Sequence, residues 1–348
     1  MGEISISKTH SWSDGLNDMQ ISPYLQELQV FAGQSDNYET ATKTLEKYLR
    51  INVSITQLKR VTKYYGEEVK EESDYNLQNA QEVKVAELTR NLEETDIVYA
   101  MVDGGMILTR EGETSNDWKE VKLGRIFSSK DICELDKHHN WLKDSIYCGH
   151  LGDYTSFLKK FEPLTDLLDG LNERLVFVAD GASWIWRWIM ESYPKATQIL
   201  DFYHAVEHLA KFAKVHLKNK ATVSQWLAKQ KVALLNDKIV DIIKEIKDLK
   251  CSKSVDKERD RLLTYLTNNQ NRMLYKTFMD RGLKIGSGAI ESAHRTVIQK
   301  RMKQSGQRWG QSGAQNIIDL RLLNINQKWE VVVDLIKHKE RTKFKKSA

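Results

Sequence analysis

Two acidic residues end apolar runs, at positions where a metal-dependent enzyme places its ligands. Asp103 closes the run that starts at Asp96, and Asp180 closes Arg174–Ala179; glycine follows each acid. An apolar strand with an acid at its carboxyl end is typical of sites in open α/β sheets. Each Asp-Gly taken alone is also explained as a turn. Together they predict ligands of two Mg²⁺ or Mn²⁺ ions, because hard cations prefer carboxylates.

A third acid opens a late basic helix. Gly286-Ser-Gly precedes Glu291, which stands in the first helical turn. We predict Glu291 as the third metal ligand. The basic residues that follow are predicted to contact DNA phosphates: Arg295, Lys300, Arg301, Lys303, Arg308 and, further on, Arg321. Trp309 is predicted to contact DNA, and a place in the core is an equally good interpretation.

A histidine follows the third short apolar run, Gln198–Asp201. The motif Asp201-x-x-His204 resembles one found in mutator-like and hAT transposases, and this resemblance implies that Asp201 orients His204, which would bind a phosphate or move a proton. An Asp that caps a helix beside an ordinary histidine is the alternative.

Two zinc interpretations compete with this one. His204-Ala-Val-Glu207-His208 matches the H-x-x-E-H pattern of a zinc metalloprotease, but this leaves Asp103 and Asp180 unexplained. A structural zinc would use irregularly spaced residues, with no C-x-x-C pair among them: Cys133, His138, His139, Cys148 and His150.

Composition bounds the class of protein. The chain has 348 residues, of which 41% are hydrophobic and 29% charged, and three cysteines. It has no apolar run near the ~20 residues of a membrane span, and its first 20 residues are polar rather than signal-like. We expect a cytoplasmic protein. Residues 205–348 carry 31 Lys/Arg against 14 Asp/Glu, whereas residues 1–204 carry 22 against 34. This asymmetry favours a polyanionic partner for the C-terminal half.

The N-terminal part is predicted to be helical. After a flexible lead, 1–21, helices are expected from Ser22-Pro23 to Gly33, over Glu39–Arg50, and over Ile55–Tyr65 with Gly66 as the stop. The last two resemble a helix-turn-helix with a basic face of Lys59, Arg60 and Lys63, which would bind DNA. A plain helical hairpin explains them equally well. An acidic linker completes this region, 22–95.

The remaining chain is predicted as a core interrupted by helices. Strands are expected at Asp96–Asp103, Met106–Arg110, Trp118–Phe127, Arg174–Asp180 and Gln198–Asp201, and helices at His150–Phe161 and Ser183–Ser192. The core would occupy 96–204 and 282–328, with an all-helical insertion at 205–281. A C-terminal helix and a mobile basic tail would fill 329–348.

Several stretches resemble bacterial insertion-sequence DDE transposases of the ISKra type. The matching motifs are Val102-Asp-Gly-Gly105, Ala179-Asp-Gly-Ala-Ser-Trp-Ile-Trp186, Asp201-Phe-Tyr-His-Ala-Val-Glu-His208, Gly286-Ser-Gly-Ala-Ile-Glu-Ser292, Arg301-Met-Lys-Gln-Ser-Gly-Gln-Arg-Trp309 and Gly313-Ala-Gln-Asn-Ile-Ile-Asp-Leu-Arg321. They span about 95–325. The set is specific, although no single motif is.

The resemblance implies a ribonuclease-H-like mixed sheet, related to the cores of mutator-like and hAT transposases. It implies an acid triad of Asp103, Asp180 and Glu291 that cleaves and joins phosphodiester bonds with two metal ions. The helical insertion explains why Glu291 lies 111 positions after Asp180. Terminal inverted repeats and target DNA would be the partners of a homodimer or larger assembly associated with the nucleoid. A domesticated DNA-binding protein is the alternative.

Overall fold

Five strands form the central sheet, in the order β5-β2-β1-β6-β7. The computed structural model describes residues 21–71, 76–111, 115–134, 140–217, 219–249 and 252–347. The strands are β1 (Val98–Glu111), β2 (Ser115–Ser128), β5 (Ile146–Leu151), β6 (Leu175–Ala179) and β7 (Thr197–Leu200). β2 is antiparallel to both of its neighbours, whereas β6 is parallel to β1 and β7. This confirms the predicted mixed α/β class.

The register of the parallel strands places the two predicted acids side by side. β1 pairs with β6 from Val98↔Leu175 to Val102↔Ala179. Every side chain of β6 is buried, as expected for a short apolar strand in the middle of a sheet. Asp103 and Asp180 occupy the next position on each strand, where the pairing ends.

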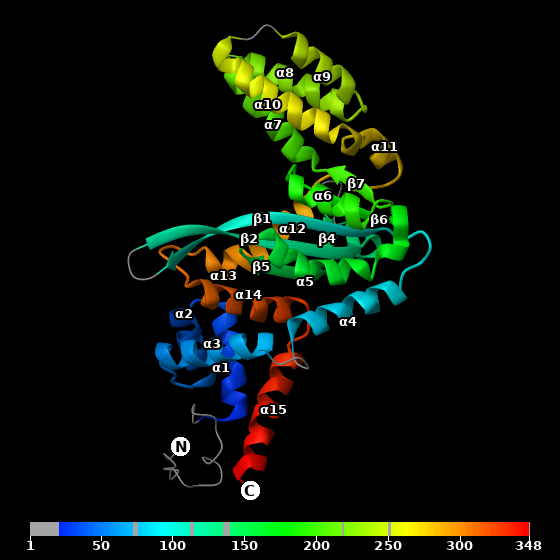
Figure 1. Cartoon of the computed structure of the whole chain (residues 1–348). Helices are drawn as coiled ribbons and strands as arrows, with labels where there is room; N and C mark the ends of the chain where they lie inside the picture. Colours follow the sequence, from blue (N-terminus) through cyan, green and yellow to red (C-terminus); the bar gives the residue numbers. More distant parts are fainter. Residues whose placement is uncertain are drawn as a thin grey trace.

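Helices cover both faces of the sheet (Figure 1). A Cβ added at Gly124 would lie 2.4 Å from Phe161 of α5 (Tyr154–Asp166), and one added at Gly149 would lie 3.3 Å from Ile318 of α14 (Gln311–Ile325). Gly124 pairs with Cys148, so Gly124 and Gly149 face opposite sides. Asp103 pairs with Leu123, which puts its side chain on the α14 face.

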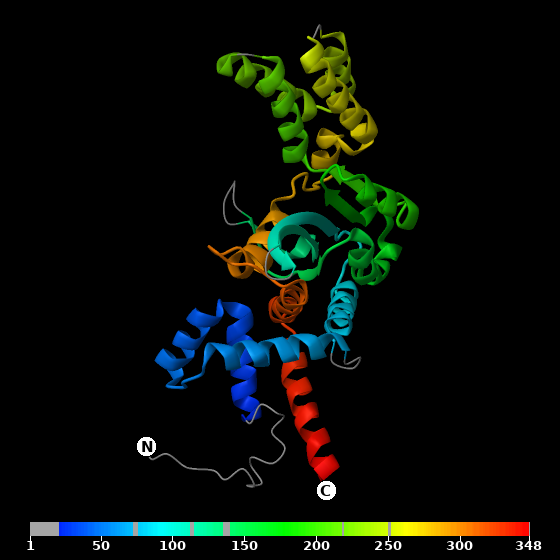
Figure 2. The same ribbon diagram turned by 60° about the vertical axis from the view of Figure 1, so that its left-hand side comes forward.

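The N-terminal helices pack beneath the sheet, against α14 (Figures 1 and 2). They are α1 (Pro23–Ser35), α2 (Tyr38–Leu49) and α3 (Ile55–Glu71), followed by α4 (Leu77–Arg90). Side chains of Ser22, Asn37 and Ser54 accept hydrogen bonds from backbone N–H groups in the first turns of α1, α2 and α3. Ser54 therefore caps the N-terminus of α3.

The stretch after β7 extends away from the sheet on the opposite side (Figures 1 and 2). It consists of α7 (Phe202–His216), α8 (Lys220–Leu234), α9 (Ile239–Asp248), α10 (Lys253–Asn269) and α11 (Tyr275–Asp280). The chain returns beside its exit, because Phe202 N donates to the carbonyl of Ile285 at 3.0 Å.

The remaining elements are the β3–β4 hairpin (Ile132–Glu134, Asn140–Leu142), α6 (Ser183–Ser192), α12 (Gly288–Ala293), a π-helical segment (His294–Gln299), α13 (Lys300–Met302) and α15 (Glu330–Ser347). α15 packs against α1 and α3 rather than against the sheet (Figure 1). In the described ranges, every helix is too short or too polar to cross a bilayer.

Four predictions about elements were wrong. β1 is one strand of 14 residues rather than two; Asp103-Gly104-Gly105 lies where pairing with β6 stops and pairing with β2 continues. α3 continues through Gly66, because this glycine serves close packing: a Cβ there would lie 2.6 Å from Asn316 Cβ.

The other two concern residues near His150 and the C-terminus. His150 belongs to β5 rather than to a helix, and α5 begins after Asp153, which accepts from Ser156 N. Residues 339–346, predicted as a mobile tail, are part of α15. The predicted flexible lead, 1–21, lies almost wholly outside the described residues.

Candidate functional site

Asp103 and Asp180 are the residues that directly follow the last paired residues of β1 and β6, Val102 and Ala179. Asp103 Oδ1 accepts from Gly104 N at 2.7 Å, and Asp180 Oδ1 accepts from Ala182 N at 3.0 Å, at the start of α6. Burial raises the pKa of Asp103 above its ordinary value, and the negative charge of Asp180 acts in the same direction. Two half-buried carboxylates that repel each other are stabilised when a cation binds between them.

Asp201 is a fully buried acid at the end of β7. Its Oδ1 accepts from Tyr203 N and Ser287 N; its Oδ2 accepts from His204 N, His204 Nδ1 and Ser287 Oγ. Burial raises the pKa of this carboxyl, but the hydrogen bonds from His204 and Ser287 outweigh burial and lower it. Asp201 is therefore a buried carboxylate that holds other residues in place.

His204 is held in one orientation by Asp201. Its Nδ1 lies 2.6 Å from Asp201 Oδ2, and a third of the imidazole is exposed. The hydrogen bond to Asp201 raises the pKa of His204 to about 9, with the charge of Asp180 acting in the same direction. His204 is thus an imidazolium at neutral pH with Nε2 left for a ligand, an arrangement suited to binding a phosphate.

Glu291 is connected to this group through Ser287. The Ser287 hydroxyl lies 3.1 Å from Glu291 Oε1 and 2.9 Å from Asp201 Oδ2, and its one proton can serve one carboxylate at a time. Arg125 on β2 donates to the carbonyl of Ala289 at 2.6 Å, which fastens α12 to the sheet. Glu291 is exposed.

His294 is a site residue that the sequence analysis missed. Its Nε2 lies 3.6 Å from Asp103 Oδ2, and the side chain is buried beside Gly105. Burial lowers the pKa of His294, and the charge of Asp103 opposes this. The pattern Glu291-x-x-His294 could have indicated it, because residues three apart lie on the same face of a helix.

Tyr265 brings the helical insertion into contact with the site. A Cβ added at Gly181 would lie 2.2 Å from Tyr265 Cε2, so the glycine after Asp180 makes room for this ring. The ring stacks on His208 with centroids 3.8 Å apart. Burial raises the pKa of Tyr265, and Asp180 is the next largest cause.

The donor set suits a hard divalent cation, although the three predicted ligands are not gathered. Among the described residues, no group of three His, Cys, Asp or Glu side chains is close enough to hold a metal ion. Asp103 and Asp180 are adjacent in register, whereas the hydrogen bond from Ser287 draws Glu291 toward Asp201.

The predicted DNA contacts divide by exposure. Those with exposed side chains are Lys59, Arg60, Lys63, Arg295, Lys300, Lys303 and Arg308. Arg301, Trp309 and Arg321, by contrast, are buried.

Arg301, Trp309 and Arg321 do not fit the predicted contact with DNA. Arg301 donates twice to the carbonyl of Gly33 and lies over the ring of Trp309, whose Nε1 donates to Met302 O. Arg321 donates to carbonyls of the π-helical segment and of Gln34. All three are buried and hold the protein together, so we withdraw them from the set of DNA contacts.

The zinc interpretations gain no support from the geometry. In the described parts of the chain, His204, Glu207 and His208 are not joined by a further His, Cys, Asp or Glu side chain into a group that could hold a metal ion. Cys148 is a buried thiol whose pKa burial raises to about 12. His138 and His139 lie outside the described residues.

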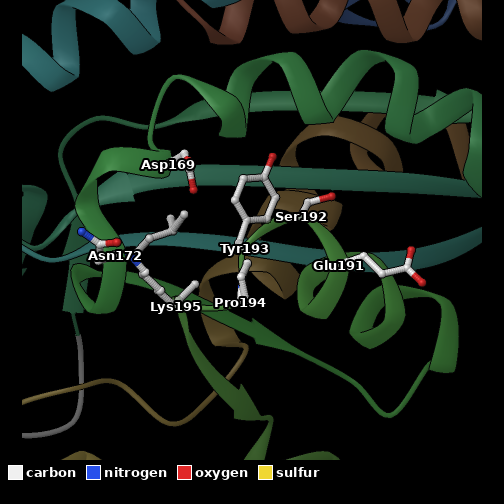
Figure 3. Close-up of a pocket in the computed structure, with 9 residues that line it drawn as sticks. Asp169, Asn172, Glu191, Ser192, Tyr193, Pro194 and Lys195 are labelled. Carbon is white, nitrogen blue, oxygen red and sulfur yellow. The ribbon is translucent and has the colours of Figure 1, made fainter.

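A pocket of about 360 Å³ lies at the other edge of the sheet (Figure 3). Tyr193 and Lys195, just before β7, line one part of it. Asp169 and Asn172, which precede β6, line another part. The acids lie after these strands, so this pocket is separate from the site.

Comparison with protein-family models gives no match, and comparison with curated proteins gives no significant match.

Proposed function

We propose that this protein is a DNA transposase of the DDE type that cleaves and joins phosphodiester bonds at the ends of a mobile element. The observation that carries the proposal is the adjacent placement of Asp103 and Asp180 at the point where the parallel pairing of β1 and β6 ends. The order of acids along the chain, strand, strand and late helix, is what the resemblance to ribonuclease-H-like transposases requires.

The proposed metal ligands are Asp103, Asp180 and Glu291. When bound, two divalent ions supply an activated attacking oxygen and stabilisation of the leaving oxygen. Asp103 and Asp180 keep a concentrated negative charge at the sheet edge, which selects a divalent cation. Glu291 would complete the set by exchanging its hydrogen bond with Ser287 for the metal.

His204 holds the scissile phosphate in this proposal. Its imidazolium, fixed by Asp201, presents Nε2–H to a phosphate oxygen, and a charge-assisted hydrogen bond of this kind is stronger than a neutral one. The histidine thus positions the phosphodiester beside the acids.

The exposed basic residues give the DNA path. Arg295, Lys300, Lys303 and Arg308 follow Glu291 directly along the chain, so DNA bound there passes beside the acids. Lys59, Arg60 and Lys63 lie on the exposed face of α3, a helix of the type that enters a major groove. We assign recognition of the element ends to α3.

The test is cleavage of the DNA that flanks the coding region, by the purified full chain with Mg²⁺ or Mn²⁺. We expect strand cleavage that Asp180→Asn lowers by at least 10³-fold, or ~4 kcal/mol in barrier. Asp169→Asn, an exposed acid at the opposite edge of the sheet, is the matched control and should cleave like the wild type. Cleavage that survives Asp180→Asn would remove the acid assignment.

A DNA-binding protein that no longer cleaves is the second candidate. The separation of Glu291 from the other two acids favours it. It predicts binding of the same flanking DNA with salt-dependent affinity and no metal-dependent cleavage.

A further inference from the structure

The buried imidazole of His294 has a nitrogen that the rest of the site does not account for. His294 is 5% exposed, and its Nε2 has no hydrogen-bond partner among the described residues. This nitrogen lies 3.6 Å from Asp103 Oδ2, beyond hydrogen-bonding distance. Leaving a buried polar nitrogen unpaired costs about 1–3 kcal/mol, so its place beside an acid needs an explanation.

Two features of the backbone hold the imidazole there. A Cβ added at Gly105 would lie 2.8 Å from His294 Nδ1, so the ring occupies space that only glycine leaves. His294 also begins the π-helical segment, a rare conformation found mostly at functional sites. Arg321 donates to the carbonyls of Thr296 and Val297 and so stabilises that segment.

We propose that His294 is a positioning residue for Asp103, to which it donates a hydrogen bond from Nε2 when the site is occupied. This rests on the proposed function, because Asp103 is there a metal ligand. A movement of about 0.6 Å brings the two atoms from 3.6 Å to hydrogen-bonding distance. Gly104 N–H already holds the other oxygen of Asp103.

With a donor on each oxygen, the plane of the Asp103 carboxylate is fixed. The remaining lone pairs can then be presented toward Asp180 and a shared cation. Hydrogen bonds of this kind to metal ligands are worth 10–100-fold in metal affinity. A supporting role fits His294 better than direct ligation, because Mg²⁺ takes oxygen ligands.

The test is Mn²⁺ binding to the full chain, followed by electron paramagnetic resonance, for the wild type, His294→Leu and His294→Gln. Leucine removes the donor at similar size, so we expect Mn²⁺ affinity to fall 10–100-fold. Glutamine keeps an amide N–H near the position of Nε2 and should recover most of the affinity. Thr296→Val, an exposed change in the same π-helical segment, is the control and should bind Mn²⁺ like the wild type.

Melting temperature and DNA affinity are measured alongside, to separate positioning from loss of structure. Should His294→Leu fail to fold, Gly105→Ala replaces it, because the added Cβ pushes the ring away from Asp103. If His294→Leu binds Mn²⁺ as tightly as the wild type, the role proposed for His294 is wrong, whereas the proposed function of the protein is not affected. Failure of glutamine to rescue also overturns the role proposed for His294. A wild-type protein that neither binds Mn²⁺ nor cleaves DNA overturns the proposed function as well.

Discussion

The pair formed by Asp201 and His204 gives the site a dependence on pH. The pKa of His204 is raised to about 9 from an ordinary value near 6.5. A raised pKa means that the folded protein binds the proton more tightly, so the stabilisation is complete below pH 6.5. It is lost as the pH rises through 9.

We therefore expect the free energy of unfolding of the wild type to fall by about 1–2 kcal/mol between pH 6.5 and pH 9, relative to His204→Gln. This figure is discounted because a third of the imidazole is in solvent. Urea unfolding of both proteins at the two pH values measures it. If the free energy of unfolding changes with pH by the same amount in both proteins, the pairing of His204 with Asp201 is contradicted.

The sequence was sufficient to predict the site residues that end apolar runs. It was not sufficient to predict the residues that join the site through tertiary contacts. Asp103 and Asp180 were predictable because an apolar run ending in Asp-Gly is a local pattern. The shared hydroxyl of Ser287 and the ring of Tyr265 come from elements distant in the chain. No local pattern reports that Tyr265 packs against Gly181.

At the scale of elements, two helical glycines have opposite roles. Gly66 lies between α3 and α14, and an added Cβ would approach Asn316 to 2.6 Å; at Gly313 nothing lies within 4 Å. We expect Gly66→Ala to destabilise the protein by about 1–3 kcal/mol through overpacking. Gly313→Ala should stabilise it by up to ~1 kcal/mol, because alanine favours the helix.

Thermal or urea unfolding of the two glycine variants checks the pair. The informative result is the sign of each change, since both substitutions add the same methyl group inside a helix. A stabilising Gly66→Ala would mean that α3 and α14 are not packed as described.

Arg301 and Lys300 are neighbours with different surroundings on α13. Arg301 is 1% exposed, donates to Gly33 O and lies over the rings of Tyr38 and Trp309. We expect Arg301→Met to cost about 2–4 kcal/mol, because the carbonyl loses its buried partner. The matched change of the exposed Lys300→Met should stay within ~0.5 kcal/mol.

Unfolding and DNA affinity, measured together, separate the two roles. Lys300→Met should weaken DNA binding without loss of stability, in keeping with its exposure. A destabilised Lys300→Met, or an unaffected Arg301→Met, would reverse our division of the basic residues. The sequence could not make this division, since a run of basic residues carries no sign of which ones are buried.

At the scale of the whole molecule, the N-terminal helices and the core present separate basic surfaces. Replacing Lys59, Arg60 and Lys63 by Gln removes three exposed charges from α3. If each neutralises one phosphate, the slope of log affinity against log salt concentration should decrease by about 2.7. Titrations of flanking DNA at several salt concentrations measure the slope.

The control is Lys337→Gln on α15, where Lys337 forms an exposed ion pair with Asp334. This substitution should leave the slope unchanged. An unchanged slope in the triple variant would remove α3 from the DNA-binding surface. The general charge asymmetry of the two halves was visible in the sequence. It did not indicate α3, which belongs to the acidic half.

The hydrogen bond from Phe202 N to Ile285 O has a mechanical consequence. The two segments that join the helical insertion to the sheet are hydrogen-bonded to each other there, and again where Ser287 donates to Asp201. Asp201 and Ser287 in turn hold His204 and Glu291. We therefore expect a displacement of the insertion, for example by DNA bound to α8 or α9, to change the relative positions of these four residues.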